Sequence, residues 1–209
     1  MAKIFQADNP LNRFLYKFGS MILLNIYFLL CCLPVITVGA SLTAANTVCY
    51  KMREEPDVKI TSTFFKSFGK NFLDSTLVWI VLAGIMSAVV FIFVKALGGE
   101  GYAAMAVCVL CIIAAIIVMS GGTFVFMILG RYSNPIYEQI LNAYKVGFSH
   151  LNWCVVIWLL WAVPVLLFAS FPVLLRYFGW IWLLVGFALL IYITAGVYRR
   201  VFKHVENKD

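Results

Sequence analysis

The sequence predicts an all-α polytopic membrane protein with about six membrane segments, folded as a single transmembrane domain over residues 1–209. Of its 209 residues, 64% are hydrophobic and only 12% are charged, whereas ordinary soluble domains have roughly 45–50% and about 25%. Several runs without charge are long enough to cross a hydrocarbon core about 30 Å thick, which takes roughly 20 helical residues. These runs are continuously apolar rather than alternating, which excludes a transmembrane β-barrel.

The first uncharged run, residues 18–50, is interrupted near its middle by Pro34 and Gly39. It is too long for one straight crossing and short for two full ones. Helices tend to end before a proline, and glycine tolerates the backbone angles of a turn. We therefore expect a hairpin with segments at about residues 15–33 and 37–50. The second limb is short, about 21 Å at a rise of 1.5 Å per residue, and either crosses fully or is re-entrant.

Four further membrane segments follow at about residues 75–96, 102–130, 151–175 and 178–199. Two stretches outside them, at about 62–73 and 134–149, have the periodicity of amphipathic helices. The second has a start signal in Asn134-Pro135, an N-cap followed by proline in the first turn. Each precedes a pair of membrane segments, and we expect each to lie in the membrane interface.

The basic residues predict the orientation, because Lys and Arg concentrate in cytoplasmic loops. If residues 18–50 turn back, 14 of the 16 Lys and Arg residues lie on one side, and only Lys95 and Arg176 on the other. If the run crosses once, the split falls to 11 and 5, because the first three basic residues, Lys3 among them, change sides. We therefore predict an integral protein of the cell (plasma) membrane with both termini in the cytoplasm.

No motif in the sequence predicts catalysis. The phosphate-binding pattern G-x-x-x-x-G-K-[ST] is absent, and no ionisable group lies deep in a membrane segment, where pumps and proton relays carry them. Cys108-x-x-Cys111 has the spacing of a metal or redox pair, but lacks further ligands and is interpreted as small apolar packing. We expect no enzymatic activity, no cofactor, no metal and no nucleic acid. Anchoring to anionic membrane lipid explains the net charge of +7.

Polar residues gather in the first hairpin, and such groups form hydrogen bonds between helices in lipid. We expect Asn25 and Asn46 to be able to meet across the hairpin. The polar set is interpreted as intramembrane packing, with a partner-facing surface and a solute path as alternatives. The candidate positions are Asn25, Pro34, Thr37, Gly39, Thr43 and Asn46.

Two aromatic sets on the amphipathic helices are candidate partner-facing surfaces. Their spacing of three and four residues places the rings of each set on one helix face. The sets are Phe64, Phe65, Phe68 and Phe72 on the first helix, and Tyr137, Tyr144 and Phe148 on the second.

The proline-centred stretch at residues 33–40, LPVITVGA, with Thr43-Ala44 after it, resembles the bacterial YesL-like family, a domain of unknown function. The other matching positions are Asn9-Pro10, Phe14, Asn25 and the stretches 64–72 and 131–143. The resemblance implies a multi-spanning membrane protein, common in Gram-positive bacteria, without catalytic residues. It also implies genes that neighbour those of sugar-importing ABC permeases, solute-binding proteins and glycan-degrading enzymes.

From this association we expect a non-catalytic accessory membrane subunit of a carbohydrate (oligosaccharide) ABC importer. It would pack beside the permease subunits and, through them, join an ATPase and a solute-binding protein. A permease itself is not expected, because Glu138-Gln139-Ile140 followed by Gly147 does not reproduce the E-A-A…G coupling motif of such permeases. Two alternatives stay open: a stand-alone small-solute transporter or channel, and a transient regulator or assembly factor of a sugar transporter.

Overall fold

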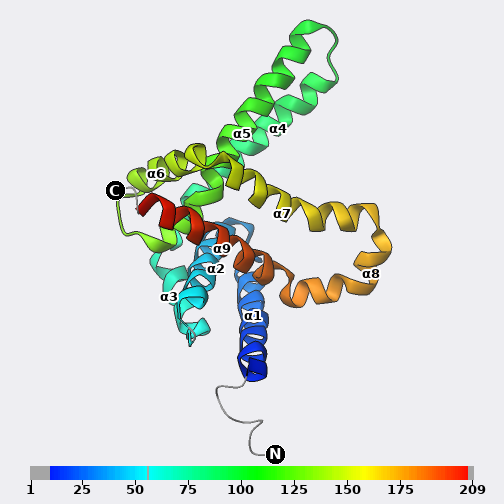
Figure 1. Ribbon diagram of the computed structural model, residues 1–209. Coiled ribbons are helices and arrows are strands. Elements are labelled where there is room, and N and C mark those ends of the chain that lie inside the picture. The colour runs from blue at the N-terminus through cyan, green and yellow to red at the C-terminus, as the bar shows by residue number, and fades with distance from the viewer. Residues whose placement is uncertain (1–9, 56, 207–209) are drawn as a thin grey trace, which may run out of the picture.

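The computed structural model describes residues 10–55 and 57–206, which contain helices and no strands (Figure 1). Lys3 and Asn9, which entered the charge count and the family pattern, lie outside the described residues. Five stretches of the described chain are long and apolar enough to cross a membrane: Leu15–Cys32, Phe72–Leu97, Tyr102–Arg131, Leu151–Ser170 and Arg176–Lys203. The predicted all-α polytopic membrane fold is therefore confirmed.

The first hairpin consists of α1 (Pro10–Cys32), the short helix η2 (Val35–Thr37) and α2 (Val38–Glu54). Pro34 is extended and ends α1, as proline chemistry predicts. The chain then turns back, and the Tyr16 hydroxyl near the start of α1 donates to the carbonyl of Val58, just after α2, at 3.5 Å. The two ends of the hairpin therefore lie on the same side.

Helix α2 differs from the other predicted membrane segments. It has 17 residues, and its hydrophobic and polar residues nearly balance. The rest of the chain buries 11 of these residues. It does not belong to the five apolar stretches that could span a membrane by length and composition. It is an internal helix of small and polar residues, and a sixth full crossing stays a prediction.

The second hairpin follows α3 (Ile60–Lys70) and consists of α4 (Phe72–Leu97) and α5 (Tyr102–Arg131). Gly101 makes the connection at φ +92°, a backbone angle that favours glycine. Figure 1 shows the far ends of both helices extending away from the other helices. Trp79, near the start of α4, donates to the carbonyl of Val35 in the first hairpin at 2.9 Å. Helix α4 therefore continues about 27 Å beyond the proline-centred turn.

Helix α6 (Ile136–Ser149) runs back along the inner half of α5. Its buried face is Gln139, Ala143 and Gly147. A Cβ atom on Gly147 would lie 2.8 Å from the backbone carbon of Ser120, so the two helices touch backbone to backbone. The helix that was predicted to lie in the membrane interface is thus packed on α5. Its small residues allow this close contact, which the periodicity of its aromatic residues did not indicate.

The last part comprises α7 (Leu151–Ser170), α8 (Pro172–Ile181), the π-helical segment η3 (Trp182–Gly186) and α9 (Phe187–Glu206). In Figure 1 the chain leaves the body along α7, reverses at α8 and returns along α9.

Hydrogen bonds from two guanidinium groups join the return helix α9 to α2, and Arg199 Nη1 on α9 donates to the carbonyl of Arg53 at 3.1 Å. Arg53 donates from Nε and Nη2 to the carbonyl of Tyr192, at 3.0 and 2.7 Å, and stacks on the Tyr192 ring at 4.1 Å. This is possible because Gly196 has no side chain: a Cβ atom there would lie 2.8 Å from the guanidinium carbon.

Candidate functional site

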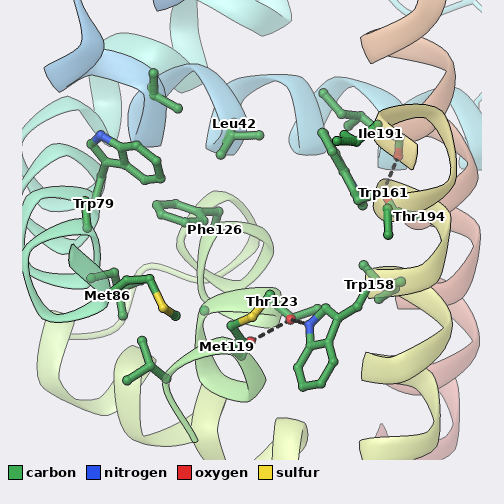
Figure 2. Close-up of a pocket in the computed structure, with 18 of the residues that line it drawn as sticks. Leu42, Trp79, Met86, Met119, Thr123, Phe126, Trp158, Trp161, Ile191 and Thr194 are labelled. Atoms are coloured by element: carbon green, nitrogen blue, oxygen red, sulfur yellow. Dashed lines mark hydrogen bonds between the residues drawn. The ribbon is translucent and has the colours of Figure 1, made fainter. Parts of the chain in front are cut away.

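A groove of about 1460 Å³ opens between the α4–α5 hairpin and α7. Residues from α1, α2, α4, α5, α7 and α9 line it. In Figure 2, Trp79 and Met86 of α4 face Trp158 and Trp161 of α7 across the open space, and Phe126 of α5 lies between them. The groove is therefore assembled from the first hairpin, the second hairpin and the last helices together.

Three of the rings that line the groove, those of Trp79, Trp158 and Tyr198, are held by hydrogen bonds at their polar ends. Trp79 donates to Val35, as described above, and Trp158 Nε1 donates to the Thr123 hydroxyl at 2.8 Å. The Tyr198 hydroxyl donates to the carbonyl of Thr123 at 2.7 Å. Because these polar atoms are satisfied within the protein, the rings present apolar faces to the open space.

The lining contains no Asp, Glu, Lys, Arg or His. One uncharged amide is present, that of Asn46 on α2, whose side chain is only 6% exposed. Asn46 forms no side-chain hydrogen bond with any described residue. The amide borders the open groove, so a polar group that enters the groove can pair with it. The site can therefore bury an apolar body and offer it an uncharged donor and acceptor.

Asn25 of α1 does not meet Asn46 as expected. Its Nδ2 donates to the carbonyl of Leu183 at 2.6 Å, and its Oδ1 accepts from the N–H of Ala188 at 2.8 Å. These two groups are five positions apart, the spacing of a π-helical hydrogen bond. The carboxamide thus bridges the backbone where the irregular segment η3 joins α9. The sequence holds no local signal for this contact, because its partners lie about 160 residues away.

The other polar candidates of the first hairpin are packed within the described chain. The Thr37 hydroxyl donates to the carbonyls of Cys31 and Pro34, at 2.6 and 2.7 Å, which holds the turn. The Thr43 hydroxyl bonds to that of Ser75 at 2.8 Å. Gly39 lies against α4, where a Cβ atom would overlap the Ser75 carbonyl. These groups therefore pack against other parts of the described chain, and their role as intramembrane packing groups stays a prediction.

The two aromatic sets are only partly exposed. Phe64 is completely buried, with its ring 5.9 Å from that of Tyr27 on α1, so the structure places this member of the first set in the core. Phe68 and Phe72 are partly covered, which leaves Phe65 as the exposed ring of that set.

In the second set, Tyr137 and Phe148 are exposed, whereas Tyr144 lies over Gly121 of α5. Partial burial raises the pKa of the Tyr144 hydroxyl above its ordinary value. Exposed aromatic rings therefore remain at Tyr137 and Phe148, and whether they meet a partner stays a prediction.

Comparison with known proteins finds a family match for residues 21–94 of the chain. Residues 21–94 match the family described as a protein of unknown function, DUF624. This is the domain of the YesL-like family. In this chain the match runs from α1 to near the end of α4, and so contains the proline-centred turn and Asn46. No curated protein and no solved structure matched the chain.

Within the described part of the chain, no three His, Cys, Asp or Glu residues lie together in a way that could hold a metal ion. The pair Cys108 and Cys111 lies on α5 with both thiols free. Among the described residues, the groove is the candidate binding surface that we consider further.

Proposed function

We propose that the protein is a non-catalytic accessory membrane subunit of a bacterial carbohydrate (oligosaccharide) ABC importer, which packs beside the permease subunits. The observation that carries this proposal is the apolar groove, together with the exposed apolar helices that border it. A concave, uncharged surface between helices long enough to span a membrane suits the packing of another membrane protein. The family's association with sugar-importing permeases supplies the kind of partner.

The lining of the groove favours helix packing over sugar passage. A path for a sugar needs several polar groups that replace its hydrogen bonds with water, because an unpaired hydroxyl in an apolar medium is costly. Here the tryptophans, Phe126 and the aliphatic side chains dominate, and the Thr123 and Thr194 hydroxyls bond to backbone carbonyls of their own helices. The stand-alone transporter is therefore the weaker candidate.

Affinity purification of the full-length chain from its native membrane, in a mild detergent, tests the proposal. We expect stable co-elution with two permease subunits and an ATPase. A monodisperse protein without partners that moves solute in liposomes would contradict the proposal and favour the transporter. Loss of sugar uptake on deletion, without any physical association, would replace it with a transient regulator.

A further inference from the structure

We infer that the groove receives one uncharged transmembrane helix of a partner protein, and that a polar side chain of this helix bonds to Asn46. The inference rests on the proposed function and gives the chemistry of its contact. It combines the size of the groove, the small residues on its walls and the unpaired amide in its lining.

The size of the groove fits a helix. A helix about 10 Å in diameter fills a volume of this size over about 19 Å, or roughly 12 residues. The wall formed by α4 has a similar length, because lining residues run along it from Trp79 to Val94, about 22 Å of helix. The occupant would thus be covered over about three turns. Since no charged residue lines the groove, these turns must be uncharged as well.

Small residues on the walls permit close approach. Ala83 and Ser87, one helical turn apart on α4, both line the groove, and Ala162 lies on α7. This small-xxx-small spacing is typical of helix contacts in membranes. Gly122 on α5 also lines the groove, and a Cβ atom there would meet only Leu82, at 3.6 Å. Space is therefore open where a neighbouring backbone would lie.

The amide of Asn46 favours a helix over a lipid chain. A carboxamide has donors and an acceptor to satisfy, whereas the acyl and ester parts of a lipid have no donor. A serine, threonine or asparagine on a partner helix both donates and accepts. Such a contact would pair an amide that is nine-tenths buried and has no hydrogen-bond partner among the described residues.

Photo-crosslinking in native membranes tests the inference. The photoreactive residue p-benzoylphenylalanine replaces Met86, which lines the groove, or in the matched control Ile85, which is 45% exposed and does not line it. We expect Met86 to cross-link to one transmembrane peptide of another protein and Ile85 not to do so. Cross-links from Met86 to lipid alone or to a second copy of this chain, or no cross-link at all, would overturn the inference.

Substitutions in the groove provide the second readout. Asn46→Leu should lower the yield of the Met86 cross-link about threefold to thirtyfold, the range of one interhelical hydrogen bond. Ala83→Leu with Ala162→Leu fills the groove without touching the core and should lower the yield about fivefold or more. Gly84→Leu is the control, because Gly84 faces open space outside the lining. Elution volume and melting temperature show whether each variant is folded.

The outcomes separate this inference from the proposed function. A cross-linked helix from a membrane protein other than an importer permease would support the inference and contradict the importer assignment. Co-elution of permease subunits with a chain whose groove cross-links only to lipid would support the assignment and overturn the inference. Unchanged cross-linking in the filled, folded variant would also overturn it.

Discussion

The carboxamide of Asn25 on α1 forms hydrogen bonds with the backbone of η3 and α9. It binds Leu183 and Ala188, at the π-helical irregularity before α9. Removing it leaves a partly buried carbonyl and a buried N–H without this partner, and each unsatisfied buried group costs about 1–3 kcal/mol. The residue thus links α1 to the return helix, although it lies in the first hairpin.

We therefore expect Asn25→Leu, which keeps the size of the side chain, to lower the free energy of unfolding by about 2–5 kcal/mol. Thermal unfolding in detergent measures this, with Asn142→Leu on the exposed face of α6 as the control. Equal melting temperatures for the two variants would show that the bridge does not contribute to stability.

Arg53 and Gly196 form a second coupled pair, between α2 and α9. Because a Cβ atom on Gly196 would meet the guanidinium, Gly196→Ala should displace it from the Tyr192 carbonyl. We expect a loss of about 1.5–3 kcal/mol, the value of hydrogen bonds to a charged group. In an Arg53→Met background the same glycine substitution should cost little. Urea unfolding of the four proteins gives the coupling, and additive losses would contradict the contact.

Helix α6 depends on small residues rather than on its aromatic face. Gly147 allows contact with the backbone of Ser120, and we expect Gly147→Ala to push α6 from α5 and cost about 1–3 kcal/mol. Gly69→Ala on α3 is the matched control, because no atom lies near its Cβ position. The control should be neutral or stabilising by up to about 1 kcal/mol, owing to helix propensity. Equal effects of the two substitutions on thermal unfolding would refute the close packing.

The helices were predictable from the sequence where the signals are local. Pro34 predicts the turn, and the long apolar runs predict the bounds of α4, α5 and α7 to within about five residues. The pairing partner of Asn25 was not predictable, because no periodicity links residues so far apart. Burial of Phe64 was missed for a similar reason: a ring on an amphipathic face can meet lipid, a partner or, as here, the ring of Tyr27. The groove was not predictable either, because it depends on how the first hairpin, the second hairpin and the helices α7 and α9 are placed relative to one another.

Across the whole chain, the orientation in the membrane remains a prediction that labelling can test. In a background without the six native cysteines, single cysteines at Lys59, Lys95 and Arg176 are exposed to a membrane-impermeant thiol reagent outside intact cells. In the six-segment arrangement each hairpin begins and ends on the cytoplasmic side, which places Lys59 inside and Lys95 and Arg176 outside. We therefore expect only the cysteines at Lys95 and Arg176 to react. Labelling at Lys59 from outside would contradict this arrangement.

We propose that the apolar groove holds the protein beside its partner in the membrane. The most direct measurement is the fraction of permease subunits that co-elutes with the tagged chain carrying Ala83→Leu and Ala162→Leu, compared with the Gly84→Leu control. We predict that co-elution falls about fivefold or more with the filled groove and stays unchanged in the control. Equal co-elution from both folded variants would contradict the claim.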